Sequence, residues 1–373
     1  MGNSNFGSYK GKPSSLGIMR QMGTSAWVDN ISREWFHNGM LEHLIESGIV
    51  GLTSNPSIFA SAISATSLYD EQIFSLAKAH TPAREIAIDL ATSDVAHAAQ
   101  ILLGVYSDTN HDDGWASLEV DPDLAMDRDT TFKAAIALNQ AVDHPNVFIK
   151  IPATKPGLGA VEDAIAEGIS VNVTLIFSIE RYREVYLAYL RGSQRFLDNG
   201  GDPQHLRSVA SFFVSRVDSA IDPILISQNR TDLMGQAAVA QARLAYVAFE
   251  EISNTPEAKA LFARGIKPQR PLFASTSTKN PDYPKLLYVE NLIGSETVNT
   301  MPLATVQEML ENGNPKPNSI SENTDQARVL LHETFKELNI DLVAITDELE
   351  RAGVESFSQS WHNLIAEINK KIA

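Results

Sequence analysis

The chain has 373 residues, a length that fits one large α/β barrel or two average domains, with the 43% hydrophobic and 20% charged residues of a globular protein. Its 46 acidic residues outnumber 30 lysines and arginines, and the net charge of −16 argues against non-specific binding to nucleic acid or anionic membranes. The chain has no cysteine, which excludes disulfides, cysteine metal ligands and thiol nucleophiles and fits a reducing compartment.

The first 24 residues are polar and rich in glycine and serine, without the apolar segment of a signal peptide. Nowhere does the sequence show the run of about 18 apolar residues that indicates a membrane helix. We therefore expect a polar N-terminal segment over residues 1–24 of a cytoplasmic protein that binds neither nucleic acid nor membranes.

Short apolar runs recur along the chain, separated by stretches long enough for helices. We interpret eight of them as strands: Ala26–Asp29, Ile49–Thr53, Leu118–Val120, Val147–Ile151, Ser170–Thr174, Val209–Phe213, Leu272–Ala274 and Leu287–Val289. Strands that alternate with helices predict βαβ units and a parallel sheet. Eight such strands favour an α/β fold of the (β/α)₈ TIM-barrel type over residues 25–310, with the active site at the carboxyl ends of the strands.

Two intervening segments have a clear helical pattern. Residues 82–103 carry apolar side chains at steps of three or four, after Thr81 as N-cap and Pro82 at the first helical position. Residues 235–252, rich in Ala, Gln, Arg and Glu, predict a second helix. The main alternative fold is an open doubly wound sheet, whose glycine-rich first turn is represented only by the fragment Gly-Leu-Gly at 157–159.

The last part of the chain differs in composition from the barrel. Residues 311–326 are polar and rich in proline and asparagine, which predicts a loop. Residues 327–373 then have a helical pattern with one apolar face: Leu330, Leu331, Phe335 and Leu338. We expect residues 311–373 to form a helical extension that caps or flanks the barrel.

Lys150 stands within the apolar run Val-Phe-Ile-Lys-Ile-Pro at 147–152. Such a run is typical of a strand buried on both faces, where an ammonium group is expensive to desolvate. A buried lysine that releases its proton is a nucleophile toward carbonyl carbon and forms a Schiff base. The alternative is a lysine whose ammonium group extends to solvent from a strand end.

Polar residues end or follow several of the predicted strands, at positions that face the mouth of a barrel. They are Asp29, Asn55, Glu119, Asn172, Thr174, Ser211, Arg216, Ser277 and Lys279. Taken singly, each also has a structural explanation. Asp29 and Asn55 fit helix N-caps, and Glu119 fits a solvated loop acid. Arg216 fits a surface ion pair, and the neighbouring Phe213 fits either a wall of the site or plain core.

Two stretches resemble the signatures of one known family. Residues 51–59, Gly-Leu-Thr-Ser-Asn-Pro-Ser-Ile-Phe, are similar to the N-terminal signature of the transaldolase family. Residues 147–154, followed by Gly-Leu-Gly-Ala at 157–160, resemble the active-site lysine signature of that family. Residues 27–33 and 275–280 also fit, and they are most like the longer bacterial transaldolases. The resemblance extends over roughly residues 20–300 and more loosely over the C-terminal helices.

The resemblance implies a (β/α)₈ barrel that transfers a dihydroxyacetone unit in the non-oxidative pentose phosphate pathway without a cofactor. The donor would be fructose 6-phosphate or sedoheptulose 7-phosphate, and the acceptor erythrose 4-phosphate or glyceraldehyde 3-phosphate. In this pattern Lys150 forms the imine, and Asp29 takes the hydroxyl proton whose loss starts cleavage. Glu119 and Thr174 hold a water molecule that shuttles protons during imine formation.

The remaining candidates would hold the substrate. Asn55 and Asn172 would bind the dihydroxyacetone hydroxyls, with Phe213 as a wall of the site. The phosphate would contact four residues: Arg216, Lys279, Ser211 and Ser277. Many transaldolases carry arginine at the position of Lys279.

Competing functions remain at this point. A fructose 6-phosphate aldolase would release free dihydroxyacetone, but that subgroup is much shorter, and its proton-shuttle residue usually differs from the glutamate found here at Glu119. A non-catalytic sugar-phosphate binder would be expected to have lost Lys150 or Asp29. The nine histidines form no metal-spaced pair, and we predict no metal. The oligomeric state stays open, a homo-oligomer included.

Overall fold

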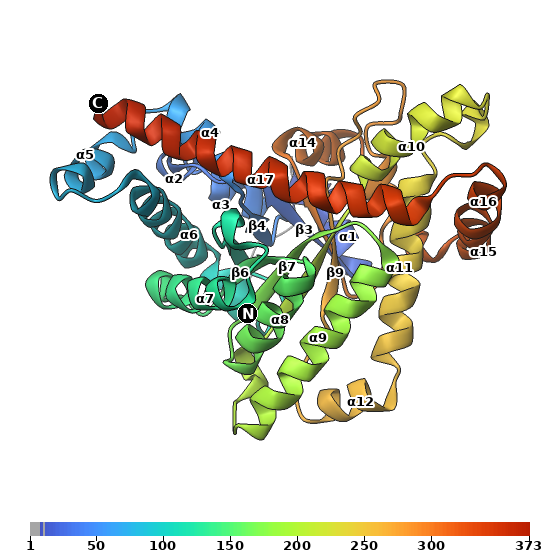
Figure 1. Ribbon diagram of the computed structural model, residues 1–373, viewed down its shortest axis with the longest axis horizontal. Helices are drawn as coiled ribbons and strands as arrows, with labels where there is room; N and C mark the ends of the chain where they lie inside the picture. Colours follow the sequence, from blue (N-terminus) through green and yellow to red (C-terminus); the bar gives the residue numbers. More distant parts are fainter. Residues whose placement is uncertain (1–7, 10–11) are drawn as a thin grey trace.

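The computed structural model describes residues 8–9 and 12–373, and its centre is a closed barrel of eight parallel strands (Figure 1). In order around the barrel the strands are β10 (Thr297–Met301), β3 (Thr24–Asp29), β4 (Gly51–Thr53), β5 (Trp115–Glu119), β6 (Val147–Pro152), β7 (Val171–Ile176), β8 (Ser208–Phe213) and β9 (Arg270–Ala274). The barrel closes because β10 pairs with both β3 and β9. The predicted (β/α)₈ barrel is confirmed, and closure excludes the open doubly wound sheet.

Seven of the eight predicted strands overlap strands of the barrel, and the eighth prediction is wrong. Residues 287–289 belong to the short helix α13 (Leu287–Asn291), whereas the last strand is β10. Three of the five residues of β10 are polar, so it does not form an apolar run in the sequence. It is nevertheless buried throughout, and its side-chain oxygens are bonded inside the protein, as between Thr300 and Thr53 at 2.7 Å.

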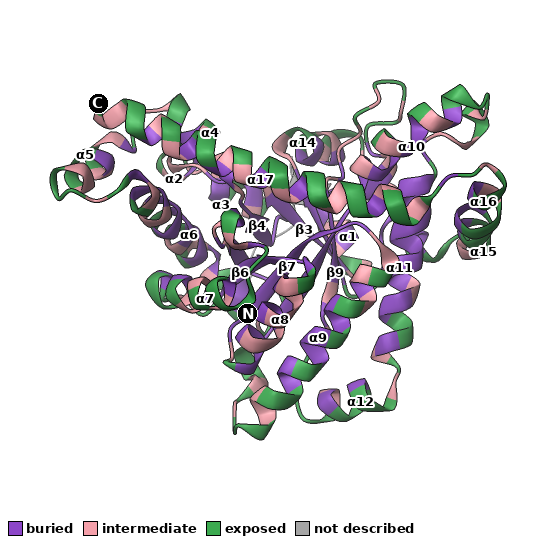
Figure 2. Cartoon of the chain, in the orientation of Figure 1, coloured by how far each residue is buried: buried purple, intermediate pink, exposed green. Residues whose placement is uncertain are grey.

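A layer of helices surrounds the strands (Figure 1). It comprises α2 (Arg33–Asn38), α3 (Met40–Glu46), α4 (Pro56–Ala65), α5 (Asp70–Lys78), α6 (Ala83–Asp108), α7 (Arg128–Val142), α8 (Lys155–Ala166), α9 (Ile179–Asp198), α10 (Ser215–Ser227), α11 (Ala237–Ser253), α12 (Pro256–Ala263), α13 and α14 (Leu303–Asn312). Short 3₁₀ turns follow at η1 (Pro122–Leu124), η2 (Pro203–His205) and η3 (Thr231–Leu233). Figure 2 shows the strands and much of α11 buried beneath this layer.

The two helices predicted in detail are present as α6 and α11. The expected N-cap at Thr81 is wrong, because the cap of α6 is Pro82, whose φ of −60° and ψ of 146° place it just outside the helix. Within the described residues, α6 is the one helix long and apolar enough to cross a membrane, but half of its apolar window is buried inside the protein. A helix that packs on a barrel meets the same criteria.

The N-terminal segment contributes a helix to the fold. Residues 1–7 and 10–11 lie outside the described part of the chain. The rest forms a short hairpin, β1 (Ser8–Tyr9) and β2 (Lys12–Pro13), followed by α1 (Ser15–Gln21). Leu16 and Met19 of α1 are fully buried, so part of this polar segment packs against the body of the protein.

The C-terminal extension runs from a loop into a long helix. After α14 come η4 (Ser319–Ser321), α15 (Thr324–Arg328), the π-helical turn η5 (Val329–Thr334), α16 (Phe335–Glu337) and α17 (Leu342–Ile372). The predicted apolar face is inside, with Leu330, Leu331 and Phe335 buried and Leu338 partly buried. Residues 311–326 are mostly loop, interrupted by the short turns η4 and α15.

Helix α17 crosses the end of the barrel (Figure 1). It contacts α10, β7, η1, α4, α6 and α5 along its length. At Gly353 it comes so close to the barrel that an added Cβ would lie 3.2 Å from Leu175 and 3.3 Å from Phe177. A larger side chain there would push α17 away from the carboxyl ends of the strands.

Alternation along the strands divides the barrel interior into an apolar end and a polar end. Trp115 and Phe148 stack at 4.1 Å between ring centroids at the amino ends of β5 and β6, and Trp27 packs against Phe148. Two residues further along each strand the side chains are polar. Lys150 of β6 therefore lies at the carboxyl end of the barrel, in register with Glu119 of β5.

Candidate active site

A cavity of about 140 Å³ lies at the carboxyl ends of the strands. Nine of the eleven residues predicted from the sequence line it: Asp29, Asn55, Lys150, Thr174, Ser211, Phe213, Arg216, Ser277 and Lys279. Residues from six strands or the turns after them meet here, although they are far apart in the sequence. The two predicted residues outside the lining are Glu119 and Asn172, the register partners of Lys150 on the two neighbouring strands.

Lys150 is held inside the protein and not at its surface. The residue is 5% exposed, so its ammonium group does not extend to solvent. Its Nζ donates hydrogen bonds to the Ser54 carbonyl at 2.7 Å and to Glu119 Oε2 at 3.1 Å. A buried charge needs such partners. These two bonds fix the position of Nζ at the floor of the cavity.

Two carboxylates flank the amine in different surroundings. Asp29 accepts a hydrogen bond from Thr53 at 2.6 Å, and the N-cap of the following helix is Ser32, so Asp29 is not a helix cap. Burial raises the pKa of the Asp29 carboxyl, while the Lys150 charge and the Thr53 hydrogen bond act in the opposite direction. Asp29 thus holds its proton more tightly than an exposed aspartate does.

Glu119 is a buried partner of Lys150 and not a solvated loop acid. Its side chain is 4% exposed. Burial raises the pKa of Glu119, the charge and hydrogen bond of Lys150 lower it, and the charge of Asp29 raises it. Glu119 Oε1 and Thr174 Oγ1 are both buried without a hydrogen-bond partner. Two unsatisfied oxygens at the floor of one polar site could share a small donor such as water.

Of the two predicted amide residues, Asn55 lines the cavity and Asn172 does not. Asn55 lines the cavity and also caps α4 by accepting from the Ile58 amide at 3.1 Å, so the structural explanation applies to it. Asn172 is fully buried, and both ends of its amide are occupied. It accepts from Ser211 at 2.6 Å and donates to Ser117 at 3.3 Å. Asn172 therefore links Ser211 of the cavity lining to Ser117 and does not itself line the cavity.

The opposite side of the cavity carries two cations without carboxylate partners. Among the described residues, neither Arg216 of α10 nor Lys279 forms any of the ion pairs, so Arg216 is not in the surface ion pair considered above. Burial lowers the pKa of the Arg216 guanidinium, whose carbon lies 5.3 Å from the centre of the Phe213 ring. Lys279 is exposed and donates to Ser277 at 3.1 Å. Phe213 is both cavity wall and buried core.

Several lining residues were not predicted. Phe357 of α17 lies over Lys150, with Nζ 5.8 Å from its ring centre. Its ring also packs edge-on against Phe213 at 6.5 Å. No local pattern marks Phe357, because its place depends on the path of α17 across the barrel. Thr300 and Pro302 were missed together with their strand, although a Thr-Met-Pro sequence after alternating residues could have drawn attention to them.

Within residues 8–9 and 12–373, no three His, Asp or Glu side chains are grouped as a metal site requires, and the absence of a metal stays a prediction. A buried amine paired with one carboxylate and faced by another, at the carboxyl ends of a (β/α)₈ barrel, defines a lysine-dependent aldolase class of enzyme.

Comparison with known proteins narrows this class. The family model described as Transaldolase/Fructose-6-phosphate aldolase matches residues 26–368, and the chain belongs to this family. A transaldolase of Saccharopolyspora erythraea is 44% identical over 361 residues, 96% of this chain and 98% of the relative. A transaldolase of Mycobacterium leprae is 43% identical over 96% of both chains, and one of Frankia alni is 43% identical over 96% of this chain and 97% of the relative.

Proposed function

We propose that this protein is a transaldolase, which moves a dihydroxyacetone unit from fructose 6-phosphate or sedoheptulose 7-phosphate to erythrose 4-phosphate or glyceraldehyde 3-phosphate. The observation that carries the proposal is the Lys150 amine, bonded to Glu119 beneath a cavity that Asp29 lines. Family membership and the transaldolase names of the relatives support it. The activity places the protein in the non-oxidative pentose phosphate pathway, and we expect it in the cytoplasm.

The reaction begins with imine formation. The Lys150 amine adds to the ketose C2 carbonyl, and loss of water gives a protonated imine. Glu119 accepts the proton that the ammonium must release, because the two groups are already 3.1 Å apart. Its free oxygen and that of Thr174 hold the water that carries protons to and from the intermediate.

Asp29 then takes the proton of the C4 hydroxyl. The C3–C4 bond breaks, the aldehyde leaves, and the bonding electrons are taken up by the imine as an enamine. The raised pKa of the Asp29 carboxyl suits it to this task, because a carboxylate that binds protons more tightly is a stronger base. The reverse sequence with a new aldehyde completes transfer, and hydrolysis of the imine frees Lys150.

The enamine has to survive until the acceptor arrives. Phe357 and Phe213 form an apolar wall near Lys150 and limit the access of water to it. Asn55 binds a hydroxyl of the three-carbon unit. Asn172 acts beneath it and holds Ser211, which lines the cavity. Arg216 and Lys279, with Ser277, bind the substrate phosphate.

Borohydride trapping tests the nucleophile. With fructose 6-phosphate present, reduction of the imine should leave a three-carbon adduct on Lys150, located by mass mapping of peptides. Lys150→Arg keeps a cation next to Glu119 but provides no amine for an imine, and is the matched control. An adduct on another lysine, or none, would refute the assignment.

The family also includes fructose 6-phosphate aldolases, so transfer has to be separated from simple cleavage. Products are measured from fructose 6-phosphate with and without erythrose 4-phosphate. A transaldolase gives sedoheptulose 7-phosphate in proportion to the acceptor and little free dihydroxyacetone. Release of dihydroxyacetone at the same rate without acceptor would assign the protein to the other activity.

A further inference from the structure

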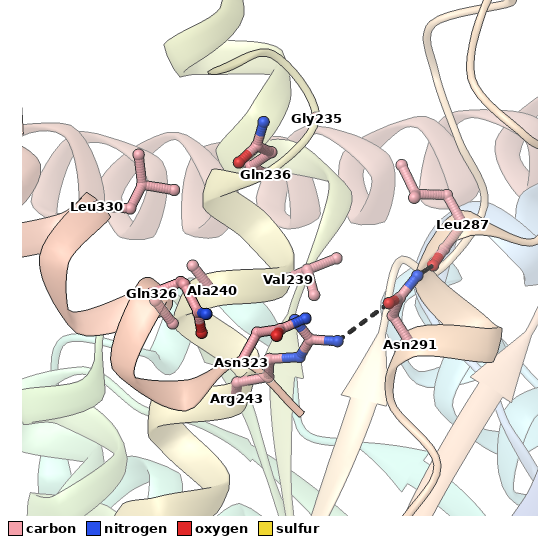
Figure 3. Close-up of a pocket in the computed structure, with 11 residues that line it drawn as sticks. Gly235, Gln236, Val239, Ala240, Arg243, Leu287, Asn291, Asn323, Gln326 and Leu330 are labelled. Atoms are coloured by element: carbon pink, nitrogen blue, oxygen red, sulfur yellow. Dashed lines mark hydrogen bonds between the residues drawn. The ribbon is translucent and has the colours of Figure 1, made fainter. Parts of the chain in front are cut away.

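A second cavity lies on the outside of the barrel, between α11, α13 and the C-terminal extension (Figure 3). Its volume of about 430 Å³ lies within the roughly 300–1,000 Å³ typical of small-molecule sites. It shares no lining residue with the cavity at the strand ends. Its floor is Arg243 of α11, which extends toward Asn291 of α13, with Asn323 beside it (Figure 3).

Arg243 is buried, and within residues 8–9 and 12–373 it has no carboxylate partner. The residue is 8% exposed, and its Nη2 donates to Asn291 Oδ1 at 3.0 Å and to the Ser319 carbonyl at 3.1 Å. Its Nε is buried and has no partner. Glu322 acts on Arg243 through its charge but lies beyond ion-pair distance. The guanidinium thus has neutral acceptors for only part of its five N–H groups.

Arg207 shows what this chain provides for a buried guanidinium elsewhere. Arg207 is 6% exposed and is ion-paired with Asp112 at 3.1 Å. Three further bonds to the carbonyls of Gln204, Leu206 and Asn110 occupy its remaining nitrogens. A buried charge is unfavourable without a counter-ion, and among the described residues Arg243 lacks the carboxylate that Arg207 has.

The lining of the cavity matches an anionic ligand. It contains one cation and no carboxylate, in a chain whose net charge is −16. Four side-chain amides line the cavity together with Arg243: Gln236, Asn291, Asn323 and Gln326. Amides both donate and accept, and so suit hydroxyl groups next to an anionic centre. Leu287 and Leu330 supply apolar sides.

We propose that this cavity binds a small oxyanion-bearing metabolite, with its phosphate or carboxylate group on Arg243 and its hydroxyl groups on the surrounding amides. The guanidinium fork matches either oxyanion with two parallel hydrogen bonds. The site is separate from that of the transfer reaction, and the proposal does not depend on the proposed function.

Binding is measured with inorganic phosphate and with citrate as probes, through the midpoint of thermal unfolding. Phosphate would also bind the cations at the strand ends, so the parent for this experiment is the full chain carrying Arg216→Ala and Lys279→Ala. We expect a saturable rise of roughly 2 °C or more with at least one probe. A rise with phosphate alone or with citrate alone would identify the oxyanion that the site binds. No rise with either probe would overturn the proposal.

Arg243→Gln in this parent should abolish the rise. Arg328→Gln, an exposed arginine of the adjacent α15 that does not line the cavity, should retain it. If Arg243 has only a structural role, Arg243→Gln would lower the unfolding midpoint in buffer and leave the probe-induced rise unchanged. That result would overturn the proposal.

A second pair of variants covers the case in which Arg243→Gln does not fold. Asn323 and Gln326 are exposed at the rim of the cavity, so Asn323→Gly, which suits the φ of 55° at that position, and Gln326→Ala should leave folding intact. Each variant should need a probe concentration about threefold or more higher to reach half of the maximal increase in unfolding midpoint. This factor corresponds to the loss of one hydrogen bond. Unchanged concentrations in both variants would contradict the assignment of the amides.

Discussion

The two ends of the cavity at the strand ends are built differently. At the reacting end, Lys150, Glu119 and Asp29 are bonded to one another or to neighbouring groups before any substrate binds. At the other end, Arg216 and Lys279 have no carboxylate partner among the residues that the structure describes. The first arrangement sets geometry and protonation in advance, and the second leaves charge to be satisfied by a ligand. Substitutions at the reacting end should therefore lower kcat. Substitutions at the other end should weaken substrate binding and raise KM.

The largest effect is expected at Asp29. Asp29→Asn keeps the volume and can still accept from Thr53, but it cannot take the hydroxyl proton. We expect kcat for transfer to fall by about 10²–10⁴-fold, the usual contribution of a general base. Borohydride trapping of the uncleaved six-carbon donor on Lys150 should persist, because imine formation uses Glu119. Measured transfer within a few-fold of the parent would remove Asp29 from the cleavage step.

Arg216 tests the other half of the comparison. Arg216→Ala removes charge-assisted hydrogen bonds worth about 1.5–3 kcal/mol each, so we expect KM for fructose 6-phosphate to rise by about 10–100-fold. The kcat should change much less, because no group at the reacting end is moved. Free fructose or dihydroxyacetone as donor provides the control, and an equal effect on phosphorylated and free donors would mean that Arg216 does not bind phosphate.

The pH dependence of the reacting end should follow the protonation of Asp29. Because burial raises the pKa of Asp29, its base form is lost on acidification at a higher pH than for an exposed aspartate, and kcat/KM falls with it. The Thr53 hydrogen bond stabilises the charged form, so Thr53→Val should move the acidic limb to higher pH. Arg216→Ala should leave the limb in place. A limb that does not move in Thr53→Val would assign it to another group.

The sequence predicted the fold and most of the residues that meet at the cavity, for physical reasons that also explain the failures. Apolar runs identify strands buried on both faces, and polar residues at their ends meet because parallel strands align their carboxyl ends. Strand β10 was missed because three of its five residues are polar, and their oxygens find partners only in the folded barrel: Thr297 with Thr24, Asn299 with Thr276, and Thr300 with Thr53. Phe357 was missed because its contact with Lys150 depends on how α17 crosses the barrel.

Asn172 shows that the sequence does not specify how deep in the barrel a side chain lies. Its place on the face that also holds Thr174 was predictable from alternation along the strand, and both residues are buried. Which layer of the barrel a side chain occupies depends on the tilt and stagger of the strands, and a single sequence does not specify them. Asn172, although paired in register with Lys150, does not line the cavity and is bonded to Ser117 and Ser211.

The smallest effect is expected at Lys279, where many transaldolases carry arginine. Lys279 is exposed, and its one hydrogen bond is to Ser277 at 3.1 Å, so its ammonium group is free to reach a phosphate as a point charge. An arginine provides a planar fork with two parallel bonds but also carries side-chain entropy that must be lost on binding. We expect Lys279→Arg to lower KM for fructose 6-phosphate by about threefold with kcat unchanged, and Lys279→Gln to raise KM by about tenfold. High salt should reduce both differences, because exposed charges are screened, whereas the effect of the half-buried Arg216 should persist. If Lys279→Gln leaves KM unchanged at low salt, the phosphate is held by Arg216 without Lys279.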